Sequence, residues 1–128
     1  MPLFIPTYFL IFALVFASSP AGAQQKLDII QIMGQFVQAN YAASKCSKPD
    51  QDTLSRFLVN FRIVMFRAEE EMRKRNPTLS EQQVVDRFKR GHENVTKKID
   101  SILEANGCSD ARIQDLLKRF QMQANLKF

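Results

Sequence analysis

Apolar residues recur every three or four positions between residues 53 and 75, which is the spacing of one face of an α-helix. This stretch also carries three aromatic rings, Phe57, Phe61 and Phe66. Burial of aromatic and aliphatic surface is strongly favourable, so we expect other helices to pack over this face. The residues assigned to it are Leu54, Phe57, Leu58, Phe61, Met65, Ala68 and Met72, with Ile63, Val64 and Phe66 widening it.

Three further segments show the helical period, and no segment shows the alternation typical of a strand. The first runs from about residue 26 to residue 44, the third ends near residue 105, and the last follows Cys108. Gly34 inside the first segment either lets a neighbouring helix approach closely or is a neutral substitution. The pattern predicts an all-α fold, an antiparallel four-helix bundle.

Breaker and capping residues separate the last three helices. Asn76 and Pro77 end the second helix, because a residue before proline avoids the α region. The sequence from Thr78 to Glu81 fits a capping box, in which each side chain bonds the other residue's backbone amide. We therefore predict that Thr78 caps the third helix and that Ser109 caps the fourth.

The N-terminal segment has a different character from the helices. Residues 3–16 are almost continuously apolar, and Ala21-Gly22-Ala23 matches a signal-peptidase site. The apolar run is shorter than the roughly 20 residues that span a bilayer. We predict a cleaved signal peptide at residues 1–23 and one helical domain at residues 24–128, without a transmembrane span and periplasmic or secreted; an uncleaved anchor is the alternative.

The sequence contains two cysteines, Cys46 after the first helix and Cys108 after the third. Short connections make successive helices antiparallel neighbours, so both cysteines fall at the same end of the bundle. Exported proteins commonly form disulfides, and the spacing fits neither a redox motif nor a zinc site. We predict a Cys46–Cys108 disulfide, and closing its loop of about 62 residues would stabilise the fold by roughly 4 kcal/mol.

Catalytic motifs are absent from the sequence. The single histidine, His92, lies in Gly91-His92-Glu93, which fits no catalytic motif. No phosphate-binding glycine loop, nucleophile motif or ligand-spaced cluster of histidines and carboxylates is found. We therefore predict a protein that is not an enzyme, with no catalytic residue, metal site or cofactor.

The chain is basic, with 18 lysines and arginines against 13 acidic residues. Many charges are matched four residues apart, as Glu69 to Glu71 are with the three following bases, which favours a solvated face with local ion pairs. The alternative is a basic end that contacts an anionic envelope component or another protein. The bundle would gather Lys26, Arg73, Lys74, Arg75 and Lys127 at the end opposite the cysteines. No nucleic acid is expected, because no aromatic residues are interleaved with these bases.

The chain resembles a family of small exported helical proteins of alphaproteobacteria. The resemblance rests on the leader ending in Ala21-Gly22-Ala23, Cys46, the segment Asp86-Arg87-Phe88-Lys89-Arg90-Gly91-His92, and Cys108 followed by Lys118-Arg119-Phe120. It implies a periplasmic helical domain and no known activity.

In size, helix content and its single bridge between distant cysteines, the chain also resembles the HdeA-like acid-stress chaperones of the periplasm. That resemblance implies a protein that opens in acid. Low pH would protonate Glu69 to Glu71, break their ion pairs and expose Phe57 and Phe61 to unfolded clients.

These observations give three hypotheses on function. The first is a non-enzymatic exported binding or accessory protein of the cell envelope, acting through a helical face or the basic end. The second is a periplasmic acid-stress chaperone. The third is an extracellular carrier of a small apolar ligand, which the many phenylalanines and methionines favour.

Overall fold

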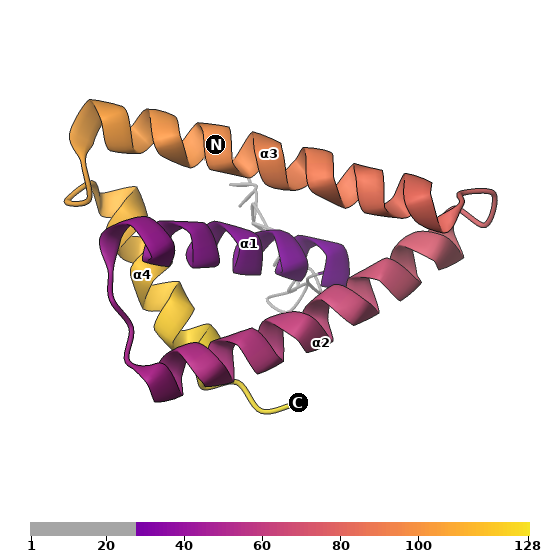
Figure 1. The fold of residues 1–128 in the computed structure, drawn as a ribbon, viewed down its shortest axis with the longest axis horizontal. Helices are drawn as coiled ribbons and strands as arrows, with labels where there is room; N and C mark the ends of the chain where they lie inside the picture. Colours follow the sequence, from indigo (N-terminus) through magenta and orange to yellow (C-terminus); the bar gives the residue numbers. More distant parts are fainter. Residues whose placement is uncertain (1–27) are drawn as a thin grey trace, which may run out of the picture.

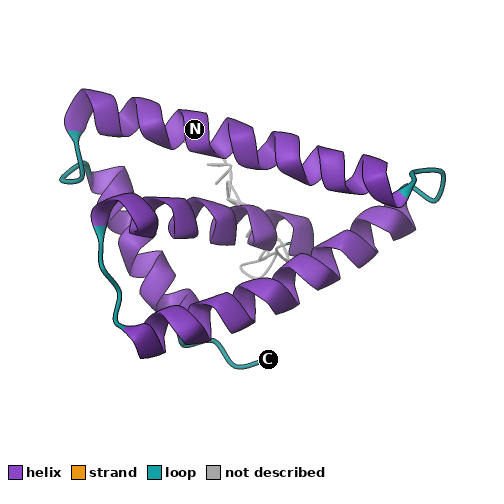
Figure 2. Ribbon diagram, in the orientation of Figure 1, coloured by secondary structure: helices purple, strands orange, loops and turns teal. Residues whose placement is uncertain are grey.

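The computed structural model describes residues 28–128, so the predicted signal peptide and Lys26 lie outside the described residues. This part of the chain holds four helices and no strand, which confirms the all-α prediction. Figure 2 shows that short loops join the helices. The helices are α1 (Ile29–Cys46), α2 (Gln51–Arg75), α3 (Glu81–Asn106) and α4 (Ala111–Ala124) (Figure 1).

Side-chain caps set where the helices begin. Asp28, Asp50 and Asp110 precede α1, α2 and α4, and each carboxylate accepts a hydrogen bond from a first-turn backbone N–H, at 3.2, 2.7 and 2.8 Å. These bonds satisfy donors that a helix N-terminus leaves free. The prediction that Ser109 caps the last helix is therefore wrong by one residue, because Asp110 holds the capping position.

The capping box of α3 lies two residues later than predicted. Ser80 Oγ accepts from the Gln83 N–H at 3.2 Å, and Gln83 Oε1 accepts from the Ser80 N–H at 2.8 Å. Thr78 belongs to the preceding turn, in which the Leu79 N–H donates to the Asn76 carbonyl at 3.0 Å. The segment contains two overlapping boxes, Thr78 with Glu81 and Ser80 with Gln83, and the turn after Asn76 selects the second.

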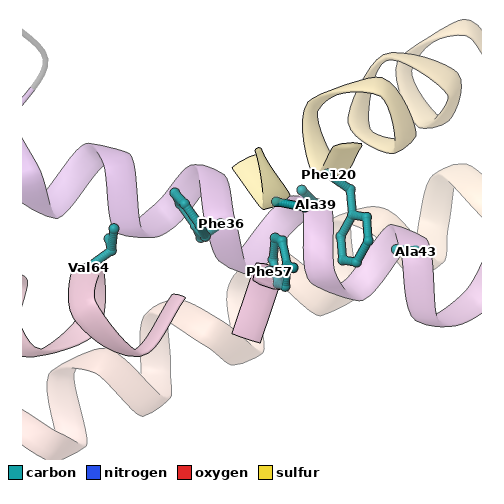
Figure 3. Close-up of a cluster of buried hydrophobic side chains, with 7 residues drawn as sticks. Phe36, Ala39, Ala43, Phe57, Val64 and Phe120 are labelled. Atoms are coloured by element: carbon teal, nitrogen blue, oxygen red, sulfur yellow. The ribbon is translucent and has the colours of Figure 1, made fainter. Parts of the chain in front are cut away.

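The hydrophobic core is built by α1, α2 and α4. Phe57 of α2 lies between Phe36 of α1 and Phe120 of α4 (Figure 3). Its ring centroid is 5.4 Å from that of Phe36 and 4.1 Å from that of Phe120, distances typical of favourable aromatic pairs. Alanines on α1 and α4 let the helices approach this cluster. Its buried members are Phe36, Ala39, Ala43, Phe57, Val64, Phe120 and Ala124, none of which comes from α3.

The longest helix, α3, lies outside this core. It meets α2 at the Asn76–Ser80 turn and then diverges from it, with α1 between the two (Figure 1). Only Val84 and Ile99 of α3 are buried. Tyr41 of α1 donates a hydrogen bond of 2.6 Å to the Asp100 carboxylate, which raises the pKa of Tyr41. Packing on α1 and this bond hold α3 along its length.

The disulfide joins the other end of α3 to the core. Cys46 and Cys108 are bonded, with their Cα atoms 5.6 Å apart, which confirms the predicted bridge. Gly107 ends α3 with a φ of 71°, a left-handed conformation that glycine adopts without steric cost. The chain therefore reverses between α3 and α4 at the point where the sulfur atoms meet.

Candidate functional site

The helix α2 has a second apolar stripe, which faces away from the core. Phe66 follows Phe57 by nine residues, about two and a half helical turns, so the two rings point in opposite directions. Val59, Ile63 and Phe66 are spaced by four and three residues and share this outward side. Val59 is 59% exposed and Phe66 is 62% exposed.

This arrangement corrects the predicted burial of the α2 face. Phe57, Val64 and Ala68 are buried as expected, but Leu58, Met65 and Phe66 are exposed. The physical reason is that α1 and α4 cover one side of α2, while α3 diverges from it. The sequence places more apolar residues on α2 than its neighbours can cover.

The C-terminal residues extend the exposed stripe. Asn60 of α2 donates from Nδ2 to the carbonyls of Gln123 and Leu126, at 2.8 and 2.9 Å. These bonds hold residues 125–128 against α2, where the Phe128 ring lies 5.3 Å from the Arg67 guanidinium. Leu126 and Phe128 are themselves exposed. We call the set Val59, Ile63, Phe66, Leu126 and Phe128 the outer face of α2.

Cationic side chains border the outer face. Arg62 and Arg67 line a surface hollow together with Ile63 and Phe66, and Glu70 is the one carboxylate among its lining residues. A neighbouring hollow is lined by Val59 and Leu126 together with Arg56 and Lys127. Arg56 is partly neutralised by Asp52, at 3.1 Å. The result is an apolar surface with cations on both sides.

Two arginines of the predicted basic end are paired with carboxylates. Arg75 is paired with Asp28 at 2.5 Å and with Glu71 at 3.0 Å. These hydrogen bonds raise the pKa of Arg75, and its hydrogen bond to Asp28 lowers the pKa of that carboxyl group. Arg73 lies 3.8 Å from Glu69. Two of the three arginine and lysine side chains at this helix end are therefore matched locally.

Lys127 is not at that end of the molecule. It lies beside Asn60, and the 13 residues from Asn60 to Arg73 correspond to about 20 Å along α2. Lys26 lies outside the described residues, and Lys74 is exposed in the last turn of α2. Contact of these five residues with an anionic partner stays a prediction, but the structure separates Lys127 from Arg73, Lys74 and Arg75.

Residues 28–128 contain neither a cluster of metal ligands nor a membrane-spanning helix. Between residues 28 and 128, no group of three or more His, Cys, Asp and Glu side chains is arranged to hold a metal ion. Within the same range, no helix combines the length and the apolar character needed to cross a bilayer. Four of the exposed large apolar side chains in this part of the chain belong to the outer face of α2, namely Val59, Phe66, Leu126 and Phe128.

No protein-family model, curated protein or solved structure matches this chain. The resemblances to two groups of periplasmic proteins therefore stay predictions.

Proposed function

We propose that this protein is an exported, non-enzymatic binding protein that attaches reversibly to an anionic lipid surface of the cell envelope. Contact is made through the outer face of α2. The observation that carries the proposal is the outward stripe of exposed Val59, half-buried Ile63 and exposed Phe66, bordered on both sides by arginines. Apolar side chains next to cations are the combination that interfacial membrane-binding helices use.

The charges favour lipid over a second copy of the chain. A symmetric dimer through this face would bring Arg62 and Arg67 of one copy close to the same residues of the other. Glu70 is the one carboxylate that lines the hollow and could compensate them. Like charges brought together in this way oppose association, whereas anionic head groups would neutralise them.

The magnitudes fit reversible attachment. Each lysine or arginine near an anionic leaflet contributes about 1 kcal/mol, so Arg62, Arg67 and Lys127 together contribute about 3 kcal/mol. Partial burial of the Phe66 and Phe128 rings adds roughly 1 kcal/mol each. A total of about 5 kcal/mol corresponds to weak binding that depends on the density of anionic lipid.

The test is co-sedimentation of the exported protein with vesicles of phosphatidylcholine alone or with about one third phosphatidylglycerol. We expect binding to the anionic vesicles that weakens with added salt, because salt screens exposed charges. Ile63→Ser combined with Phe66→Ser should lower the apparent affinity at least tenfold. Arg62→Gln combined with Arg67→Gln removes about 2 kcal/mol and should lower the affinity roughly thirtyfold, with a weaker salt dependence.

Matched controls change the same residue types elsewhere. Val85 and Met122 are exposed apolar residues on α3 and α4, outside the outer face, and Lys89 is an exposed cation on α3. We expect the same vesicle affinity as the parent protein for two control variants, the double variant Val85→Ser with Met122→Ser and the single variant Lys89→Gln. Equal loss in the control variants, or equal binding to vesicles without phosphatidylglycerol, would refute the proposal.

A further inference from the structure

A separate apolar pocket lies between α1 and α3, near the turn that joins α2 to α3. Its volume is about 240 Å³. Met33 and Val37 of α1, Met72 of α2, and Phe88 and Val95 of α3 form its walls. None of these residues belongs to the outer face of α2. The pocket arises because α3 diverges from α2 while still packing on α1.

Two glycines open the walls of this pocket. Gly34 of α1 and Gly91 of α3 both line it, and a Cβ atom built on either residue has no neighbour within 4 Å. The alternative that Gly34 permits a close helix approach is therefore wrong. Glycine weakens a helix relative to alanine. At both positions the effect of the missing side chain is to enlarge the space between α1 and α3.

Polar groups lie at the rim of the pocket. Arg87 and His92 of α3 line it, and both side chains are exposed. No ion pair among residues 28–128 includes Arg87, so its guanidinium group has no carboxylate partner in this part of the chain. A planar guanidinium group binds a carboxylate through two parallel hydrogen bonds. An apolar pocket with such a group at its rim fits an amphiphile whose head is anionic.

The pocket volume limits the size of the apolar part. An apolar cavity of about 150 Å³ binds benzene, a molecule of six carbons. By the same ratio, a pocket of about 240 Å³ holds roughly ten carbons. This space fits the chain of a short fatty acid or the ring of a one-ring carboxylic acid.

We propose that the α1–α3 pocket binds a small amphiphilic carboxylate of about this size. The apolar part lies between Met33, Met72 and Phe88, in the space that Gly34 and Gly91 leave open, and the carboxylate bonds Arg87. The proposal is independent of lipid attachment through α2, because the two sites share no residue.

The test uses decanoate as the probe and 1-decanol as its neutral counterpart, with binding measured by titration calorimetry and by native mass spectrometry of the exported protein. Gly91→Leu fills open space and should lower the affinity for both probes at least tenfold without lowering the melting temperature. Gly34→Leu should act in the same way from the opposite wall. Arg87→Gln should weaken decanoate several-fold and leave 1-decanol unchanged.

Two controls separate this site from other surfaces. Lys89→Gln removes an exposed cation from α3 outside the pocket and should leave decanoate binding unchanged. Ile63→Ser with Phe66→Ser should also leave it unchanged, which distinguishes this site from the outer face of α2. Absence of saturable decanoate binding up to about 1 mM, or binding that survives both glycine substitutions, would overturn the proposal.

Discussion

At the scale of single residues, three carboxylates hold the N-termini of α1, α2 and α4. The pKa of Asp50 is lowered mainly by the hydrogen bond from the Thr53 backbone N–H. The pKa of Asp110 is lowered mainly by its hydrogen bond with the Arg112 side chain, and that of Asp28 by its bond with Arg75. Ser80, which caps α3, carries no titratable group. Protonation of these carboxylates in acid therefore weakens the N-terminal caps of α1, α2 and α4, the three helices that form the core.

The lowered pKa values predict that the protein loses stability in acid. A carboxyl group whose pKa is lower in the folded state stabilises the fold above its unfolded pKa, and this contribution is lost as the pH falls through the folded pKa. We expect the free energy of unfolding to decrease below about pH 4. Asp50→Asn keeps a good cap and should reduce this decrease, as measured by urea unfolding between about pH 2.5 and pH 7.

Asp115→Asn is the control for this experiment, because Asp115 is an exposed carboxylate inside α4 and caps no helix. Its pH dependence should match that of the parent. An Asp50→Asn variant with the full acid sensitivity of the parent would show that the caps are not responsible. The same measurements bear on the acid-chaperone hypothesis, which requires the core around Phe57 to open at low pH.

Asn60 of α2 holds the C-terminal end of the chain in place. Its buried side chain bonds two carbonyls at the end of α4 and beyond. Asn60→Ala would remove both bonds, and leaving the buried Gln123 carbonyl unpaired costs about 1–3 kcal/mol. We expect a loss of that size in urea unfolding, whereas exposed Ser55→Ala on the same helix should stay within about 0.5 kcal/mol. Equal stability of the two variants would contradict this role for Asn60.

At the scale of helices, periodicity predicted how many there are but not what covers each face. The stripes on α1, α3 and α4 were sufficient to identify these helices, because each one repeats over several turns. On α2 the apolar residues spread over most of the circumference, and periodicity does not say which part the neighbours cover. Phe66 lies half a turn from the core because α4 crosses α2 on the side of Phe57 and Phe120.

Capping boundaries were less predictable than helices. The segment from Thr78 to Gln83 offers two overlapping boxes, and the choice depends on the turn made by Asn76 and Leu79. At α4, Ser109 and Asp110 are both good capping residues. For each of these helices the sequence offers two candidate capping residues, and the backbone geometry of the preceding turn decides which one caps the helix.

At the scale of the whole molecule, helix length explains one correct and one wrong prediction. The Cys46–Cys108 bridge followed from antiparallel helices, since the chain leaves and re-enters the same end. Lys127 was expected at the opposite end, but α4 has 14 residues against 25 in α2, or about 21 Å against about 38 Å. The chain therefore ends beside the middle of α2. This shorter reach places Leu126 and Phe128 at the outer face.

The attachment of α3 gives a prediction for the whole fold. Replacing both cysteines by alanine releases a loop spanning 62 residues and should lower the free energy of unfolding by about 4 kcal/mol. Hydrogen exchange should rise most in the second half of α3, which is next to the released bridge in a helix that packs mainly on α1. In the same double variant, the hydrogen-exchange rates of α2 should rise less than those of α3. Uniform loss of protection in all four helices would show that α3 is as firmly integrated as the core.

The bridge also makes residues 46–108 a covalent ring that includes all of α2 and α3. Pro77 and Thr78 are exposed within this ring, at the turn farthest from the sulfur atoms. A protease that cuts the backbone there would open the ring without separating the two pieces. The cut would be invisible on a non-reducing gel, and two fragments would migrate separately only after addition of a thiol.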